Sequence, residues 1–321
     1  MTTTTVIARP YAGEADLPHI VELLNACEAV DRLHWHTSVD KLRVEYADPR
    51  LDPARDLQLW QDADGALIGF AQIWILVSAE ELNGRIFTWV HPEARGGTLE
   101  TETLDWGAER LRAAAREHGL PGRLRPTTGA EQTDEVALLS ALGFAIDRYS
   151  YTMERSLSEP SPAPMLPEGF MIREMAGPEE ADLWVEMFNL SFIDHPNHSP
   201  WKVEQVLHFL DEPIYLPELN LVAAAPDGTL AGFCWMLINP EDNEHTGRKV
   251  GEIDVLGTRR GYRKLGLGRA LLLEGLRRLR LAEMETARLG VVANNPTGAL
   301  KLYESAGFQA KRTWILYGKD V

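Results

Sequence analysis

The sequence predicts an α/β protein built as two similar domains, each a mixed sheet flanked by helices. Three observations predict this: similar segments recur in order, strand patterns are mixed with helix patterns, and a proline-rich stretch separates the halves. The segment QDADGALIGFAQIWIL at 61–76 resembles AAPDGTLAGFCWMLI at 224–238. Each is typical of a β-hairpin, with a strand, an Asp-Gly turn and a second strand.

Further matches follow in the same order along the chain. Val90 matches Thr258 and Leu111 matches Leu279, each 168 residues later, and LLSALGF at 138–144 resembles LYESAGF at 302–308. An ordered series of matches indicates a duplication. Between the halves, SLSEPSPAPMLPEG at 156–169 is proline-rich and typical of a stiff, exposed linker. The sequence therefore predicts domains at 1–155 and 170–321.

Each half is expected to contain the same elements in the same order. A first helix, at 16–29 and 178–190, precedes a second helical region and the hairpin. A third strand, a loop, a long helix, a strand, a short helix and a final strand follow. The long helix is expected at 99–117 and 267–285, because leucines recur there at helical spacing in the second half. Strands mixed with helices in this way favour an α/β sandwich.

The composition is that of a globular protein that does not bind nucleic acid in general. Of its 321 residues, 45% are hydrophobic and 25% charged, and the formal net charge is −16. Phosphate backbones require basic surface, which this chain lacks as a whole. No segment reads as a signal peptide or membrane span, so we expect a cytoplasmic protein. Cys27 and Cys234 are expected to be buried thiols without a disulfide.

One segment of this acidic chain is strongly basic. RRGYRKLGLGRALL at 259–272 carries five positive charges and no negative one, between the strand GEIDVLGT and a leucine-rich helix. A helix N-terminus presents free N–H groups and a favourable dipole to an anion. Gly266 and Gly268 would allow close approach, and nearby cations would add charge. The pattern predicts a site for a phosphate or pyrophosphate, although a solvated turn would look similar.

The spacing Arg263-x-x-Gly266-x-Gly268 resembles the [QR]-x-x-G-x-[GA] motif of the GCN5-related N-acetyltransferase (GNAT) superfamily. The order from the hairpin to NNPTGALKLYESAGF is also similar, over most of 170–321 and more weakly over 1–155. Within the superfamily, the tandem arrangement resembles the mycothiol synthase group. The resemblance implies two tandem GNAT-like domains, each with a mixed, largely antiparallel sheet flanked by helices.

The resemblance also implies acetyl-CoA as co-substrate and a set of residues that bind it. The loop would hold the pyrophosphate, splayed strand amides would hold the pantetheine arm and polarise the thioester carbonyl, and an asparagine would contact the same arm. The residues at these positions are Arg263, Lys264, Leu265, Gly266, Leu267, Gly268 and Arg269 in the loop, Leu256, Gly257 and Thr258 in the strand, and Asn294 or Asn295.

Three residues are candidates for catalysis. Direct attack by an amine needs a proton acceptor, because a lysine-like amine is mostly protonated at pH 7. Glu252 and Asp254 lie two apart on one predicted strand and so share a face. By resemblance Glu252 is the general base, with Asp254 as the alternative. Tyr303 is implied as the acid that protonates the leaving thiolate, although packing alone would also explain a tyrosine there.

The first half is predicted to be a degenerate, non-catalytic domain. At the matching positions Gly266 is replaced by Thr98, Gly268 by Glu100 and Tyr303 by Leu139. A carboxylate at the pyrophosphate position would repel the coenzyme. A shifted alignment would leave Gly96 and Gly97 as a short phosphate loop, so coenzyme binding there stays open.

The sequence leaves the acceptor open between small-molecule and peptide amines. The alternative function is a non-catalytic acyl-CoA-binding or sensor protein, but retention of Glu252 and Tyr303 beside the loop favours an enzyme. We expect no metal, since neither His34 with His36 nor His195 with His198 has an acidic or cysteine partner at a telling distance. The expected partners include no nucleic acid and no membrane. A monomer is expected from the internal duplication, with a dimer as the alternative.

Overall fold

The computed structural model describes residues 6–33, 36–194, 199–294 and 298–321. The chain divides into two compact units. Unit 1 comprises residues 1–128, 133–147 and 316–321, and unit 2 comprises 129–132 and 148–315. These units differ from the predicted ranges mainly in two strands, because residues 148–155 belong to unit 2 and residues 316–321 belong to unit 1. The predicted division of function between the halves stays a prediction.

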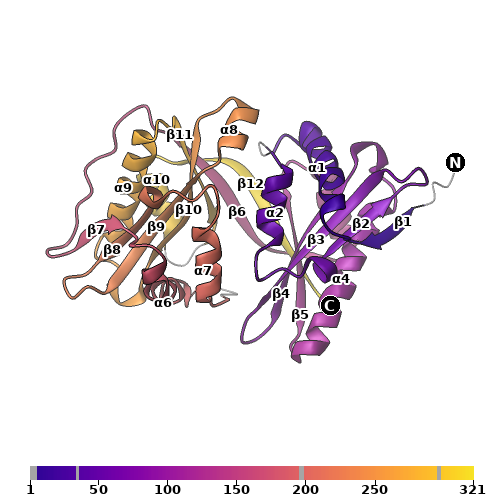
Figure 1. Ribbon diagram of the computed structural model, residues 1–321, viewed down its shortest axis with the longest axis horizontal. Helices are drawn as coiled ribbons and strands as arrows, with labels where there is room; N and C mark the ends of the chain where they lie inside the picture. The colour runs from indigo at the N-terminus through magenta and orange to yellow at the C-terminus, as the bar shows by residue number, and fades with distance from the viewer. Residues whose placement is uncertain (1–5, 34–35, 195–198, 295–297) are drawn as a thin grey trace. The chain divides into compact units, whose positions relative to one another are not determined.

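Unit 1 has a mixed sheet with helices on both faces (Figure 1). Strands β1 to β4 pair antiparallel in sequence order, and β4 pairs parallel with β5. Its strands are β1 (Ile7–Pro10), β2 (Leu57–Gln61), β3 (Leu67–Val77), β4 (Leu82–Val90) and β5 (Gly122–Gly129), and its helices are α1 (Leu17–Asp31), α2 (Val39–Tyr46), α3 (Pro53–Asp56), α4 (Leu99–His118) and α5 (Thr133–Ala141).

Unit 2 repeats this arrangement. Strands β7 to β10 pair antiparallel in sequence order, and β10 pairs parallel with β11. Strand β11 pairs on its other side with residues 150–156 of β6. The strands that lie wholly in unit 2 are β7 (Met171–Glu174), β8 (Asn220–Ala224), β9 (Leu230–Ile238), β10 (Val250–Thr258) and β11 (Thr286–Val292), and the helices are α6 (Ala181–Phe192), α7 (Val203–Leu210), α8 (Pro240–Thr246), α9 (Leu267–Leu281) and α10 (Ala299–Ser305). Strands β6 (Ala145–Ser156) and β12 (Gln309–Asp320) belong to unit 2 over residues 148–156 and 309–315 and to unit 1 over the rest.

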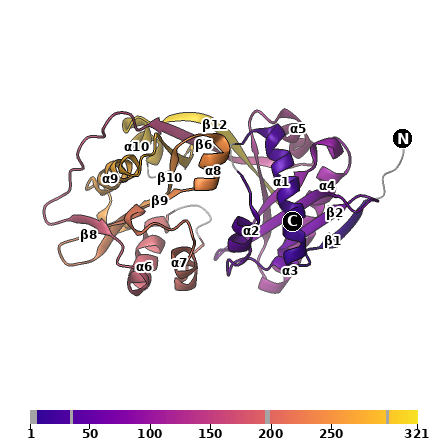
Figure 2. The same cartoon turned by 45° about the horizontal axis from the view of Figure 1, so that its top comes forward.

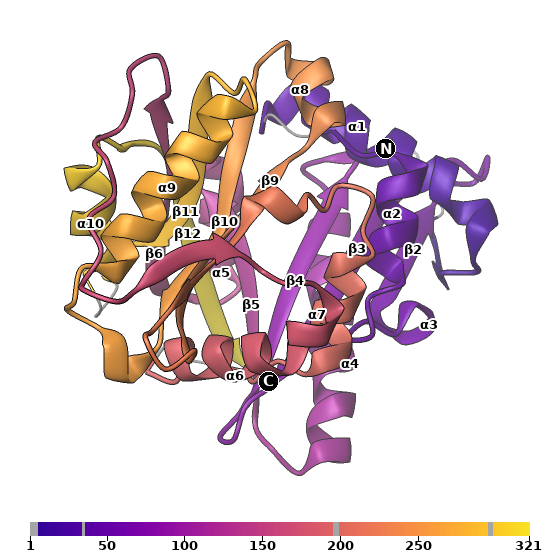
Figure 3. The same cartoon turned by 60° about the vertical axis from the view of Figure 1, so that its left-hand side comes forward.

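The core of unit 2 has two layers, one on each face of the sheet. Figure 2 shows α9 and α10 on one face and α6 and α7 on the other. Leu272 and Leu276 of α9 are fully buried. Helix α9 packs against β9 and β10, and Figure 3 shows it lying across the sheet. On the opposite face Trp184 of α6 is fully buried and stacks on Phe188 with ring centroids 5.3 Å apart. This two-layer arrangement confirms the predicted α/β fold class.

The long helix of unit 2 ends earlier than the sequence predicts. It was expected to reach residue 285 but ends at Leu281. Glu283 adopts a left-handed conformation with φ 63°, and the Met284 N–H donates to the Leu279 carbonyl. This turn satisfies carbonyls at the helix end without a glycine. Leucine spacing cannot reveal it.

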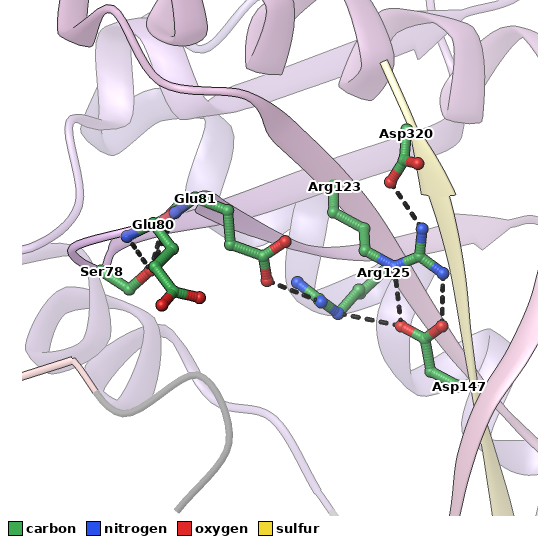
Figure 4. A network of polar contacts seen from close by, with 7 residues as sticks. All are labelled: Ser78, Glu80, Glu81, Arg123, Arg125, Asp147 and Asp320. Atoms are coloured by element: carbon green, nitrogen blue, oxygen red, sulfur yellow. Dashed lines mark hydrogen bonds and ion pairs between the residues drawn. The ribbon is translucent and has the colours of Figure 1, made fainter. Parts of the chain in front are cut away.

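A charged network fixes the end of the chain within unit 1 (Figure 4). Arg123 of β5 donates to Asp147 and to Asp320, both at 2.5 Å. Arg125 donates to Asp147 at 3.1 Å and to Glu81 at 2.7 Å. Arg125 is only 5% exposed, so its paired carboxylates are needed to offset the cost of burying it. The network therefore explains why residues 316–321 belong to unit 1.

No helix within the described parts of the chain is both long enough and apolar enough to span a bilayer.

Candidate functional site

The third strand of unit 2 carries a β-bulge at Asp254. Against β9, Ile253 pairs with Met236 and Val255 with Trp235, so Asp254 is an extra residue. Ile253 and Leu256 pack on the α9 side of the sheet, whereas Val255 packs on the α6 side. The alternation of side chains therefore slips by one residue at Asp254, as a bulge requires.

Strands β10 and β11 separate just after the bulge begins. Their parallel pairing ends at Ile253 and Leu289, although β10 continues to Thr258 and β11 to Val292. Beyond that point, among the described residues, β10 pairs with β9 and β11 with β6, but the two strands do not pair with each other. Backbone groups on the β11 side of residues 254–258 thus leave the ladder. The splay implied by the family resemblance is present.

The register shows which amides face the splay. The Arg259 N–H donates to the Ala231 carbonyl at 2.9 Å. Because hydrogen-bonded pairs alternate along an antiparallel ladder, Gly257 also directs its N–H toward β9. The N–H groups of Leu256 and Thr258 then point the other way, toward the splay. Of the three predicted strand residues, these two are placed to donate to a ligand there.

The loop before α9 leaves a run of backbone N–H groups free. A 3₁₀ turn at Arg260–Tyr262 leads to Lys264 and Gly266, both left-handed, with φ 64° and 89°. Among the described residues, no acceptor bonds the N–H groups of residues 264–269. A Cβ on Gly268 would lie 3.3 Å from Thr258 Oγ1, so a side chain there would crowd the end of β10. The loop is suited to cradle an anion.

Two of the three predicted cations already have partners in the protein. Arg263 donates to the carbonyls of Thr258 (3.3 Å) and Ser191 (2.8 Å) and to the Asp194 carboxylate (2.6 Å). Arg269 donates to Ser305 Oγ at 2.7 Å. Arg263 therefore fixes the loop to the end of α6, and its motif position is explained by structure as well as by charge. Lys264 is exposed and forms no ion pair with a described residue.

Glu252 lies within a row of alternating charges across the sheet. Arg288 Nη1 donates to Glu252 Oε1 at 3.2 Å, and Arg288 Nε donates to Glu154 Oε1 at 3.2 Å. Desolvation by the surrounding protein raises the pKa of Glu252, and the Arg288 charge opposes that rise. The side chain remains 45% exposed to solvent. Glu252 is held in place but partly neutralised.

Asp254 lies near Glu252 but, unlike Glu252, its carboxylate has no hydrogen-bond donor among the described residues. Crowding by protein atoms and the negative charge of Glu252 raise the pKa of Asp254 to about 6, from an ordinary 3.8. Its side chain is nevertheless accessible to solvent, and no hydrogen bond to a described residue holds it. A carboxylate with a pKa near the working pH is an effective proton acceptor.

Tyr303 of α10 is 7% exposed and packs edge-on against Phe308. Burial raises the pKa of its hydroxyl, and the nearby Cys234 thiol adds to the rise. The phenol is therefore neutral near pH 7 and able to donate a proton. Asn294 lies in the turn after β11, whereas Asn295 lies outside the described residues.

Metal ligation has no support in the described parts of the chain. No cluster of three or more His, Cys, Asp or Glu side chains there is arranged to hold an ion. Three of the four histidines considered from the sequence, His34, His195 and His198, lie outside the described residues.

Sequence reasoning missed the bulge, Arg288 and Asp194. The bulge did have a signal in the sequence. Gly84 and Gly251 occupy equivalent places, since an added Cβ would lie within 2.6 Å of Leu111 and of Leu279 respectively. They are 167 residues apart, whereas Val90 and Thr258 are 168 apart. One residue has therefore been inserted between these landmarks in the second half, and the register identifies it as Asp254.

Comparison with known proteins gives a consistent result. Residues 184–308 match the family model described as the acetyltransferase (GNAT) family. A curated mycothiol acetyltransferase from Thermobispora bispora is 32% identical over 320 residues, covering 98% of this chain and 99% of that protein. Another, from Thermomonospora curvata, is 31% identical over 94% of this chain and 93% of its own length.

Two solved structures share the architecture over nearly the whole chain. A GCN5-related N-acetyltransferase from Sphaerobacter thermophilus has a TM-score of 0.74 and 26% identity, covering 98% of this chain and 95% of that one. A tandem GNAT protein from the clavulanic acid biosynthesis pathway has a TM-score of 0.69 and covers 98% of both chains. At 17% identity the latter supports the fold alone. The tandem resemblance predicted from the sequence is confirmed.

Proposed function

The chain belongs to the acetyltransferase (GNAT) family, and we propose that its second half transfers an acetyl group from acetyl-CoA to a primary amine. One observation carries this proposal: the bulge at Asp254, the separation of β10 from β11, and the unbonded N–H groups of residues 264–269 all lie at or just after the C-terminal end of β10. Unit 1 lacks the bulge, because β4 pairs with β3 without a register shift, although the pairing of β4 with β5 also ends early, at Ile86 and Pro126. The enzyme class follows from the family; the acceptor, the residue roles and the choice of acetyl are proposals.

The residues present fit an acyl-CoA. We assign the pyrophosphate to the free N–H groups of residues 264–269, with Lys264 as the nearby cation. The outward N–H groups of Leu256 and Thr258 would hold the pantetheine arm and polarise the carbonyl. Asn294 lies in the turn that follows β11 and would contact the same arm. Bound acetyl-CoA supplies an activated thioester, and the protein supplies position and proton transfer.

The proton acceptor comes from the pair Glu252 and Asp254. Either carboxylate, directly or through water, would take the proton that the amine loses as its nitrogen bonds to the acetyl carbon. Asp254 is the freer of the two, and Glu252 is the one implied by family position. As the carbon–sulfur bond breaks, the Tyr303 hydroxyl would donate its proton to the sulfur. Backbone N–H groups aimed at the carbonyl oxygen require no reorganisation during this step.

The acceptor is proposed as a small molecule or a peptide N-terminus. The relatives are named mycothiol acetyltransferases, so a mycothiol-type aminosugar-cysteine precursor is the first to test. A polyamine, an aminoglycoside or a peptide N-terminus would follow. We further propose that the enzyme works without a metal, as a monomer, in the cytoplasm. Sedimentation at micromolar concentration and activity after chelation would check the first two.

Calorimetry with acetyl-CoA, followed by an amine screen, tests the proposal. One coenzyme per chain, with turnover of an amine that the Tyr303→Phe variant loses, is the expected result. Two equivalent coenzymes per chain would contradict the assignment to the second half. No binding at all would contradict the use of acetyl-CoA, and longer acyl-CoAs would then be compared.

A further inference from the structure

Unit 1 contains a cavity that none of the coenzyme-site residues lines. Its volume is about 410 Å³, and all eleven lining residues belong to unit 1. They come from α1, α2, the segments beside α2, and strands β3 and β4. The cavity is large enough for a small organic molecule.

Aromatic side chains on one face of the sheet form a wall of this cavity. Cross-strand pairs place Trp89 beside Phe70, Phe87 beside Gln72, and Trp74 beside Arg85, all on the face that α1 and α2 cover. Phe87 and Trp89 are stacked, with centroids 6.2 Å apart. Trp74, Phe87 and Trp89 are only partly buried, so their rings are available to a ligand.

The second half fills the same place with its own side chains. In the hairpin match, Gln72 corresponds to Trp235. Each of them lies opposite the first residue of the neighbouring strand: Gln72 opposite Leu57 of β2, and Trp235 opposite Asn220 of β8. Trp235 is 3% exposed and packs edge-on against Trp184, with centroids 5.4 Å apart.

The segment before the second helix shows the same replacement. Asn25 bonds the backbone of Thr37 in unit 1, and Asn189 bonds the backbone of Trp201 in the same two-way pattern in unit 2. Trp201 stacks on Phe188, with centroids 4.4 Å apart. The fold itself therefore does not require a cavity here; unit 1 has kept or acquired one.

Glu45 is a carboxylate of the cavity without a counter-charge among the described residues, and desolvation by burial raises its pKa. Gln72 Nε2 donates to Glu45 Oε1 at 2.6 Å, and no cation of the described residues pairs with that carboxylate. Arg50, by contrast, donates to both carboxylate oxygens of Asp48, with 2.6 Å as the shortest distance, and lies over the ring of Trp74. Arg85 lies at the exposed rim over Phe87. A carboxylate beside aromatic faces favours a positively charged ligand.

We infer that unit 1 binds a small organic ammonium ion in this cavity, with Glu45 as its counter-charge and Trp74, Phe87 and Trp89 as its aromatic contacts. The ammonium group would donate to Glu45, while its hydrocarbon part would displace water from the rings. The inference does not depend on the proposed acetyl transfer, because it uses no residue of unit 2.

A titration followed by ligand-observed NMR, without acetyl-CoA, tests this inference. Benzylammonium is the probe, with benzyl alcohol and benzoate as neutral and anionic probes of the same shape. We expect benzylammonium to bind at least about tenfold more tightly than either. Equal binding of the alcohol, or preference for benzoate at the arginines, would overturn the inference.

Matched variants locate the binding site. Glu45→Gln should weaken benzylammonium binding at least about tenfold, whereas Glu22→Gln, an exposed change on α1, should leave it within about twofold. Gln72→Trp, which imitates Trp235 of unit 2, should abolish binding by filling the cavity. Near-UV circular dichroism would show whether that variant folds. Unchanged affinity in Glu45→Gln would place the ammonium ion elsewhere and refute the assignment.

Discussion

The loops that precede α4 and α9 begin almost identically and end differently. Arg95 and Arg263 have backbone angles within a degree of each other, φ −70° and −69°, ψ 157° and 158°. Each guanidinium donates to the carbonyl of the last residue of the preceding strand, Val90 or Thr258. Each arginine also forms an ion pair with an aspartate: Arg95 with Asp31, the last residue of α1, and Arg263 with Asp194, just after α6. Three residues later the paths diverge, because Thr98 has φ −94° and Gly266 has φ 89°.

The divergence determines what occupies the loop amides. In unit 1 the Gly96 N–H donates to Glu100 Oε1 at 2.6 Å. The equivalent of Glu100 in unit 2 is Gly268, and the amides around it bond no described acceptor. A side chain thus supplies in one half the negative charge that a ligand would supply in the other. In unit 1 an internal carboxylate binds one loop amide and Thr98 changes the path of the loop, and we propose that these two differences together close the site.

The largest expected effect comes from moving that carboxylate into unit 2. Gly268→Glu should weaken acetyl-CoA binding roughly 1,000-fold, because like charges would meet at the loop and the new side chain would compete for its amides. Gly268→Gln is the control for size, with an expected loss of about tenfold, since any side chain there approaches Thr258. Calorimetry measures both. Equal losses would mean that crowding, not charge, closes the loop in unit 1.

The next effect concerns Tyr303, the proposed proton donor; unit 1 has Leu139 at the matching position. Tyr303→Phe keeps the ring and its contact with Phe308, so acetyl-CoA affinity should stay within about twofold. The turnover number should fall about 100-fold, as expected for loss of a general acid. Steady-state kinetics with the preferred amine gives both values. A fall in affinity without a fall in turnover would make Tyr303 a packing residue.

The third prediction concerns Asp254, the inserted residue of β10, which has no counterpart in β4. Because its carboxyl has a pKa of about 6, Asp254 loses its proton as pH rises through 6, and kcat/KM should rise over the same range. Asp254→Asn keeps the bulge but should lose this rising limb and about 100-fold in rate at pH 7. Deleting Asp254 should remove the bulge, so that β10 pairs with β9 without a register shift, as β4 pairs with β3. Acetyl transfer should then be abolished, although Leu256, Gly257 and Thr258 are still present.

Two observations separate Asp254 from Glu252. Arg288→Gln removes the charge that limits the rise in the pKa of Glu252. The rising limb of kcat/KM should therefore move to higher pH only if Glu252 is the base. The stability of the fold gives an independent reading. Since folding raises the pKa of Asp254 above 3.8, its stabilising contribution is complete below that pH and is lost as pH rises through 6. Asp254→Asn should therefore gain stability relative to wild type at pH 8, measured by urea unfolding.

Much of this was predictable from sequence, and the exceptions have physical causes. The hairpins, the long helices and the glycine loop depend on local periodicity and turn chemistry, which a single sequence displays. The assignment of residues 148–155 to unit 2 and of residues 316–321 to unit 1 depends on pairing with strands that are distant in the sequence. Nothing in the local sequence of these two segments indicates which strands they pair with. The roles of Arg263 and Arg288 depend on partners 69 and 36 residues away, which motif spacing does not encode.

A smaller effect is expected from changing Arg95 or Arg263, the arginines that hold the loop in the same way in both units. Arg95→Lys and Arg263→Lys each keep the charge but lose the forked contacts to a carbonyl and an aspartate. Each should lower the free energy of unfolding by about 1–2 kcal/mol, because each arginine donates to a strand carbonyl and to an aspartate. Only Arg263→Lys should also weaken acetyl-CoA binding, by about tenfold, as the loop loosens. A similar loss of coenzyme in Arg95→Lys would contradict a single site in unit 2.

The smallest effect is expected at the internal anion itself. Glu100→Gln leaves the side-chain length unchanged but removes the charge that the Gly96 N–H and the start of α4 stabilise. The free energy of unfolding should fall by about 1 kcal/mol, read from urea unfolding at pH 7. Coenzyme stoichiometry should stay at one, because Thr98 still turns the loop away from the conformation of Gly266. The double change Thr98→Gly with Glu100→Gly removes both differences, and a second, weaker acetyl-CoA site in that variant would show that these two residues are what closed the loop of unit 1.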